Sequence, residues 1–193
     1  MRNKTKTIGR RLLHPAVKVL ASLHVSPTAV TLTALPLSIG AAILFSQGLF
    51  TWAGITVFLA GLCDTLDGEI SRLTGKTSSI GAFLDSTVDR ASEGIVLIGI
   101  AWYYLPFSRF GVITAFLALL FSLLVSYARA RAEGIGTICT VGVFERPVRV
   151  AILVFSALLL GKSYLPWGLL LIALGSFITF LQRIYWTVKH QRR

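Results

Sequence analysis

The acidic residues of this chain are few and lie close together. Of its eight aspartates and glutamates, six fall in one segment: Asp64, Asp67, Glu69, Asp85, Asp89 and Glu93. The first two aspartates are three residues apart and the other two are four apart. On a helix, residues with this spacing share one face. Two helices packed antiparallel across the short connection 73–80 can therefore oppose their aspartates and bring four carboxylates together.

Four carboxylates at one depth in a protein cannot all stay ionised unless cations neutralise them. Oxygen ligands prefer a hard cation, so we expect Mg2+ or Mn2+. Four aspartates are enough to hold two such ions through shared oxygens, and a two-metal site suits in-line displacement at phosphorus. The alternative is that the acids form inert ion pairs with Arg72, Arg90 and other arginines.

The elements that must position these aspartates are strongly apolar. Of the 193 residues, 54% are hydrophobic and 14% are charged, with a mean hydropathy of +0.75, which is typical of a membrane protein. A membrane span needs about 20 mostly apolar residues. We expect six spans, at 29–47, 50–72, 81–105, 110–129, 147–161 and 165–188. The predicted fold is an all-α integral membrane protein with six transmembrane helices, in a single domain 1–193. Within it, 1–24 form a cytoplasmic juxtamembrane segment and 25–193 the six-helix bundle.

The residues before the first predicted span are basic and partly amphipathic. Lys6–Leu23 mixes basic residues with an apolar stripe, which predicts an N-terminal juxtamembrane amphipathic helix at the membrane surface. A basic flank that only sets topology is the alternative. Ser26 and Pro27 are typical of a helix N-cap followed by the first helical residue.

The chain carries a formal net charge of +11, and its basic residues are unevenly placed. They concentrate before the first span, after the last span and in the connections on one side, whereas the opposite connections contribute only Arg109 and Lys162. This positive-inside pattern predicts a multi-pass protein of the cell membrane with both termini and the aspartates on the cytoplasmic side. Nucleic acid is another common partner of basic chains, but no soluble basic face remains to bind it.

Read in full, the aspartate segment contains a longer pattern: Asp64-x2-Asp67-Gly68-x2-Ser71-Arg72-x8-Gly81-x3-Asp85-x3-Asp89. It resembles the signature of the CDP-alcohol phosphatidyltransferase family, with seven of the eight defining positions matched over 26 residues. The one departure is Ser71, where the family has Ala, a change between small residues that we expect to be tolerated. The six-span layout agrees with the family too, so the resemblance extends over essentially the whole chain.

The resemblance implies a transferase of phospholipid biosynthesis. It would move a phosphatidyl or archaetidyl group from CDP-diacylglycerol or CDP-archaeol to a polar alcohol and release CMP. By the same resemblance the metal ligands would be Asp64, Asp67, Asp85 and Asp89. Asp89 would also be the general base for the acceptor hydroxyl. The CDP-lipid would contact Pro27, Thr28, Gly68, Arg72, Ser78 and Gly81. An arginine can hold a pyrophosphate bidentately, and glycines allow close approach.

Arginines end the predicted fourth span and open the fifth, on the cytoplasmic side. The runs 126–134 (SYARARAEG) and 145–149 (ERPVR) look like the family branch that makes phosphatidylinositol phosphate, or its archaeal ether-lipid counterpart, from inositol phosphate. This resemblance implies acceptor-phosphate binding by Arg129, Arg149 and Arg183, with Arg146 as a further candidate. Glycerol phosphate is the nearest alternative acceptor. The alternative role for the arginines is topology-setting charge paired with Glu133 and Glu145.

Two other classes of membrane protein also use carboxylates near lipid. A prenyltransferase would show two separated aspartate motifs on a longer chain, whereas this sequence has one compact motif. A cation transporter would place its carboxylates nearer the midplane, whereas these lie toward one face. The family resemblance also implies a homodimer surrounded by membrane lipids. Glu93 follows Asp89 by four residues, and either supports the site or simply pairs with an arginine.

Overall fold

The computed structural model describes the backbone of residues 27–74 and 78–191 and the side chains of residues 31–66 and 78–191. Over these residues the chain is helical and has no strand, which confirms the predicted all-α class. The helices are α2 (Pro27–Ser46), α3 (Phe50–Thr74), α4 (Ser79–Tyr104), α5 (Arg109–Gly134), α6 (Arg146–Phe155) and α7 (Gly161–Gln191), with a π-helical turn (Ser156–Leu160) between α6 and α7. The predicted juxtamembrane helix and the N-cap Ser26 lie outside the described residues.

The helices fall on the six predicted apolar stretches, and their ends differ from the prediction for local reasons. α5 continues to Gly134 because its polar last turns stay helical, with Arg129 Nε donating to Glu133 Oε1 at 2.8 Å. α7 begins earlier than expected, at Gly161, whose φ of 63° turns the chain back from the π-helical turn. That backbone conformation strongly favours glycine.

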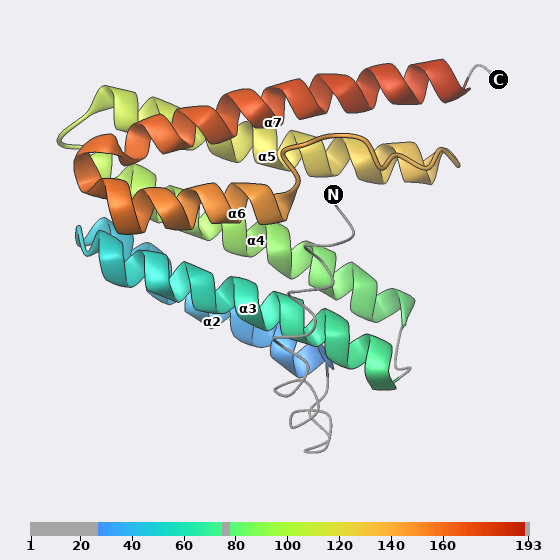
Figure 1. Ribbon diagram of the computed structural model, residues 1–193, viewed down its shortest axis with the longest axis horizontal. Helices are drawn as coiled ribbons and strands as arrows, with labels where there is room; N and C mark the ends of the chain where they lie inside the picture. The colour runs from blue at the N-terminus through green and yellow to red at the C-terminus, as the bar shows by residue number, and fades with distance from the viewer. Residues whose placement is uncertain (1–26, 75–77, 192–193) are drawn as a thin grey trace.

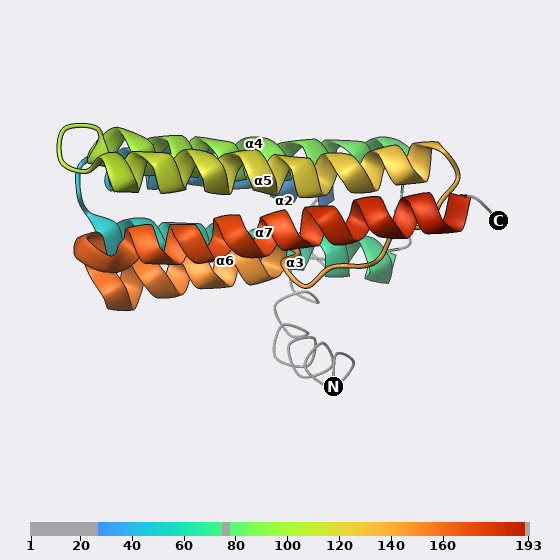
Figure 2. The same ribbon diagram turned by 90° about the horizontal axis from the view of Figure 1, so that it is seen from above.

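The helices form two layers (Figure 2). α2, α4 and α5 lie in one layer, and α3, α6 and α7 lie in the other. α2 packs along both α3 and α4, and α5 packs along α7. The prediction that the two aspartate-bearing helices pack directly against each other is therefore wrong in one respect. α2 packs extensively against both of them, whereas α3 and α4 do not pack extensively against each other, although carboxylates from both helices meet.

The helices approach closely because small residues line their contacts. Ala41, Ala53 and Ala118 are fully buried between helices. A Cβ atom added to Gly99 of α4 would lie 2.5 Å from the carbonyl oxygen of Ala42 in α2, so these two backbones touch. Small residues at such contacts are typical of helices packed in a membrane, where apolar side chains gain little by leaving lipid.

The outside of the bundle is apolar along most of its length. Leu32, Phe58, Ile113 and Leu171 are each about half exposed. Two helical stretches of the described chain, Arg109–Gly134 and Arg146–Gln191, are long and apolar enough to cross a membrane by length and composition. At one end of the bundle the turns between helices gather, and at the other end α3 and α4 diverge from α5 and α7 (Figure 1). The predicted site residues lie toward the diverging end.

Candidate active site

The described aspartates of the motif meet between α3 and α4. Asp64 comes from α3, and Asp85 and Asp89 come from adjacent turns of α4. One carboxylate oxygen of each lies within 4.8 Å of the others, and all three residues are half-buried. Ser78 is the N-cap of α4 and accepts a hydrogen bond from Gly81 N at 2.9 Å. The cap defines where α4 begins, and the spacing of the two aspartates then places both on one face.

This cluster fits a hard divalent cation. Asp85 Oδ1 is buried and has no hydrogen-bond partner among the described residues. An unpaired carboxylate oxygen away from water costs free energy, which a bound cation offsets. Three carboxylates with oxygens this close can coordinate Mg2+ or Mn2+ together. The fourth predicted ligand, Asp67, lies about one turn from Asp64 on α3, and its side chain is outside the described ones.

Arg146, in the first turn of α6, is the cationic partner of the aspartates. Its Nη1 lies 2.7 Å from Asp89 Oδ2 and 3.0 Å from Asp64 Oδ2. Its Nε is buried and has no hydrogen-bond partner in the described part of the chain. Arg90, a candidate for inert pairing, instead donates from Nη1 to the carbonyl oxygen of Ser86. One guanidinium therefore links α6 to the aspartates of both α3 and α4.

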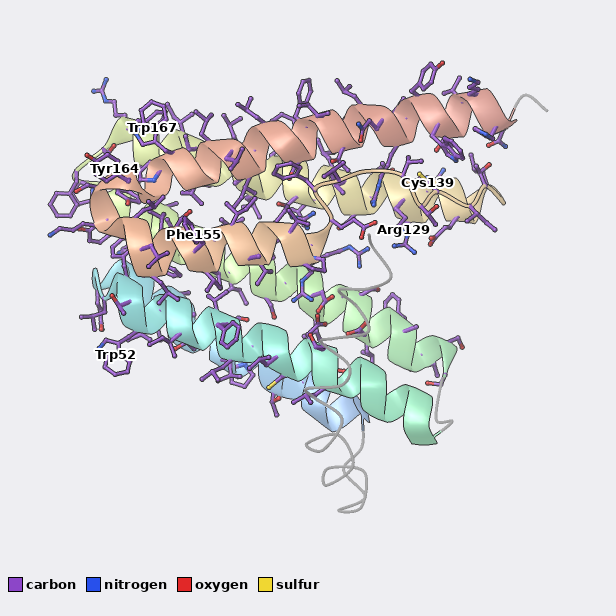
Figure 3. The ribbon with its side chains drawn as sticks, viewed as in Figure 1. Trp52, Arg129, Cys139, Phe155, Tyr164 and Trp167 are labelled. Carbon is purple, nitrogen blue, oxygen red and sulfur yellow. The ribbon has the colours of Figure 1, made fainter. Side chains whose placement is uncertain are left out.

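A polar pocket of about 590 Å³ opens beside the aspartates, between α4, α5, α7 and the start of α6. Asp85 and Asp89 line one side of it. All four arginines predicted for the acceptor also line it: Arg129, Arg146, Arg149 and Arg183. Arg129 lies far along the bundle from Trp52, Tyr164 and Trp167, which mark the opposite end (Figure 3). The structure thus brings the predicted acceptor arginines and two predicted metal ligands into one cavity.

Arg149 is held by a bidentate ion pair with Glu93. Its Nε and Nη2 donate to the two carboxylate oxygens of Glu93 at 2.7 and 2.8 Å. Its Nη1 donates to the carbonyl oxygen of Phe144 at 2.9 Å. The side chain of Arg149 is buried, at 2% exposed, and that of Glu93 is nearly so, at 11% exposed. The structure therefore assigns Glu93, whose role the sequence left open, to an arginine of the polar pocket.

The other two arginines of the pocket are held differently. Arg183 is buried, and it donates from Nε to Val141 O at 3.0 Å and from Nη1 to Val125 O at 2.7 Å. Arg129 is about half exposed and pairs with Glu133 one turn along α5. The predicted alternative, pairing with Glu133, is therefore present at Arg129. Arg129 nevertheless lines the polar pocket.

An apolar groove of about 510 Å³ lies on the other side of Arg146, between α3 and α6. Phe58, Leu62 and Val154 contribute to its walls, and Asp64 lines it as well. Because Arg146 lines both the groove and the polar pocket, the two cavities meet at the aspartate cluster. This arrangement can bring a molecule with an apolar tail and a polar molecule to the same carboxylates.

Sequence reasoning missed two features of the site. One is that Ser78 caps α4. A serine just before a helix start is a common N-cap signal, so this feature could have been predicted. The contact of Arg146 with the aspartates joins distant parts of the chain, and no local pattern indicates it. The lipid-contact roles that the resemblance gave to Ser78 and Gly81 stay predictions. The same holds for the residues whose surroundings lie outside the described ones: Pro27, Thr28, Gly68 and Arg72.

Comparisons with known proteins identify relatives over almost the whole chain. The family model for CDP-alcohol phosphatidyltransferase matches residues 24–184. The chain is 37% identical over 187 residues to archaetidylinositol phosphate synthase from Pyrococcus horikoshii, which covers 96% of this chain and 95% of the relative. It is 34% identical over 194 residues to phosphatidylinositol phosphate synthase from Mycolicibacterium smegmatis, covering 94% of this chain and 86% of the relative.

Solved structures show the same fold. The crystal structure of Mycobacterium tuberculosis phosphatidylinositol phosphate synthase (PgsA1) with CDP-DAG bound matches with a TM-score of 0.81 and 32% identity, over 92% of this chain and 94% of that one. The structure of the same enzyme in complex with manganese and citrate matches with a TM-score of 0.81 and 32% identity, over 90% of this chain and 87% of that one.

Proposed function

Because this chain belongs to the CDP-alcohol phosphatidyltransferase family, we propose that it transfers the phosphatidyl or archaetidyl group of a CDP-linked lipid to inositol phosphate and releases CMP. The observation that carries the proposal is the single cavity in which four arginines lie beside the aspartate cluster. Arginine binds phosphate with strong, charge-assisted hydrogen bonds. An acceptor without a phosphate, such as serine or free inositol, would not need several arginines in its binding pocket.

The choice of inositol phosphate over glycerol phosphate is supported by two observations. The relatives with full-length matches include archaetidylinositol and phosphatidylinositol phosphate synthases. The pocket of about 590 Å³ also has room for a ring alcohol with a phosphate. Both candidate acceptors carry a phosphate, so the arginines alone do not discriminate between them.

The apolar groove supports a lipid donor. It meets the aspartate cluster at Asp64 and Arg146, where the diphosphate of a CDP-lipid must lie for transfer. The PgsA1 relative binds CDP-DAG, and the archaeal relative is named for an ether-lipid product. We therefore propose CDP-diacylglycerol or CDP-archaeol as donor, with Arg72 on its diphosphate. Further proposed contacts of the donor are Gly68, Gly81, Ser78, Pro27 and Thr28.

The proposed metal ligands are Asp64, Asp67, Asp85 and Asp89, holding two Mg2+ or Mn2+ ions. When bound, these ions neutralise the diphosphate and the leaving CMP. Asp89 lines the pocket from which the acceptor hydroxyl arrives, so we propose that it takes the hydroxyl proton as general base. Arg146 orients the carboxylates of Asp64 and Asp89 through the oxygen that each turns toward it.

We propose that the six helices cross a membrane, with 1–24 and both termini in the cytoplasm and one domain over 1–193. The apolar exterior supports this arrangement. Trp52, Tyr164 and Trp167 are exposed at one end of the bundle (Figure 3), as expected for aromatic anchors at a membrane interface. The arginine-lined pocket lies toward the other, cytoplasmic end. A homodimer is proposed from the family resemblance, and light scattering of the detergent-solubilised protein measures it.

The proposed function is tested with purified protein in detergent, Mg2+ and a CDP-lipid, by following CMP release with one acceptor at a time. Inositol phosphate, glycerol phosphate, inositol and serine are the acceptors to compare. We expect Mg2+-dependent release with inositol phosphate alone. Release with glycerol phosphate instead would leave the family assignment intact and refute inositol phosphate as the acceptor. Release that needs no divalent ion would refute the proposed metal centre.

A further inference from the structure

Glu93 extends the row of acids on α4 beyond the proposed metal ligands. It follows Asp89 by one helical turn and lines the deep side of the polar pocket. It contacts Arg149 rather than the aspartates, through both of its carboxylate oxygens. The pair joins α4 to α6, and it is the most deeply buried ion pair of the part that the structure describes.

The hydrogen bonds of Arg149 determine which of its N–H groups are left without a partner among the described residues. A guanidinium has five N–H groups. Glu93 takes two of them, and the Phe144 carbonyl takes one. One N–H on Nη1 and one on Nη2 are thus left for a ligand. Phe144 is itself fixed, because its N–H donates to Thr179 Oγ1 in α7 at 3.1 Å.

The pair also forms the floor of the pocket. It lines a second, smaller cavity of about 40 Å³ as well, together with Arg146, Ser92 and apolar side chains. The hydroxyl of Ser92 is buried there and has no hydrogen-bond partner among the described residues. If Glu93 did not hold it, the Arg149 guanidinium could turn toward this hydroxyl and away from the pocket.

We propose that Glu93 is a positioning residue for the acceptor, which holds the guanidinium of Arg149 at the pocket floor with two N–H groups directed at the acceptor phosphate. The inference rests on the proposed function, because it concerns the same pocket. The positioning role and simple electrostatics predict opposite effects on acceptor affinity when Glu93 loses its charge. Removing a negative charge from a pocket favours an anionic ligand by Coulomb attraction, whereas releasing Arg149 weakens the binding of that ligand.

The test is Glu93→Gln, which keeps the shape of the side chain and removes its charge. Glu145→Gln is the matched control, because Glu145 lines the same pocket and forms no ion pair with another described residue. KM for inositol phosphate, KM for the CDP-lipid, kcat and the Kd for Mn2+ are measured for each. Retained Mn2+ binding shows that the variant is folded.

We expect Glu93→Gln to raise KM for inositol phosphate about tenfold, as misplaced binding groups do, with smaller changes in kcat, lipid KM and Mn2+ affinity. Glu145→Gln should lower the acceptor KM. An unchanged or lower acceptor KM in Glu93→Gln would overturn the positioning role, as would an equal rise in both variants. A wild-type enzyme that ignores inositol phosphate would instead refute the proposed function, so the two failures are distinguishable.

Discussion

The two sides of the polar pocket carry opposite charge and are built in different ways. On the aspartate side, oxygens of three carboxylates lie within 4.8 Å of one another, and one buried oxygen, Asp85 Oδ1, has no described partner. On the arginine side, the buried guanidiniums of Arg149 and Arg183 donate to a carboxylate and to backbone carbonyls. On the first side, one guanidinium, that of Arg146, faces three carboxylates, so their charge is only partly compensated. On the second side, the protein itself supplies hydrogen-bond acceptors for the buried guanidiniums.

This difference separates two ways of preparing a site. Carboxylates whose charge is only partly compensated bind a cation strongly because binding relieves their remaining repulsion. Arginines locked by the protein lose little conformational freedom when a phosphate binds, so more of the interaction appears as affinity. Substitutions on the aspartate side should therefore mainly change metal binding and chemistry. Substitutions on the arginine side should change acceptor binding and, at buried positions, stability.

The largest effect is expected for Asp89→Asn. The amide cannot accept the hydroxyl proton and binds a divalent ion weakly, so kcat should fall by about a thousandfold or more. CMP release with inositol phosphate and Mg2+ measures the loss. The control is Lys162→Gln, a charge change near the first turn of α7, at the opposite end of the bundle. Activity within about tenfold of wild type in Asp89→Asn would exclude Asp89 as the base.

A smaller effect, on binding, is expected from the arginine side, where two residues make a matched pair. Arg183→Met removes a buried guanidinium and leaves the carbonyls of Val125 and Val141 without their donor. We expect the acceptor KM to rise about a hundredfold, and stability to fall by about 2 kcal/mol because buried acceptors lose a donor. Arg129→Met removes a half-exposed guanidinium paired with Glu133. Its acceptor KM should rise several-fold, and its stability should change by less than about 1 kcal/mol.

Steady-state kinetics and thermal unfolding in detergent give both quantities for each variant. Equal loss of stability in Arg183→Met and Arg129→Met would contradict the view that burial distinguishes the two arginines. A rise in lipid KM as large as the rise in acceptor KM would place Arg183 on the donor instead.

The same division explains what the sequence could and could not predict. The aspartates lie within 26 residues, and helix periodicity alone places each pair on one face. The convergence of Asp64, Asp85 and Asp89 was therefore predictable. Glu93 and Arg149 are 56 residues apart and come from different helices. Their pairing depends on tertiary packing, which no local pattern reports.

Which helices pack against each other could also not be predicted from the sequence. The bundle helices are apolar on most of their surfaces, so an apolar stripe does not identify which face meets which neighbour. The prediction placed α3 directly against α4, whereas α2 packs against both of them. What fixes this arrangement is close contact between small residues, such as Gly99 against Ala42, and such contacts need both partners to be known.

The smallest effect is a change of stability whose sign distinguishes the two sides. Asp85→Asn removes a negative charge from a crowded cluster in which its Oδ1 has no described partner. In EDTA we expect this variant to be more stable than wild type by about 1 kcal/mol, in contrast to Arg183→Met. Added Mn2+ at about ten times its Kd should stabilise wild type by about 1.4 kcal/mol and Asp85→Asn hardly at all. Thermal unfolding with and without Mn2+ gives these four values. If Asp85→Asn were less stable than wild type in EDTA, Arg146 and the surrounding protein would compensate the carboxylates fully without metal, and the two sides would not differ.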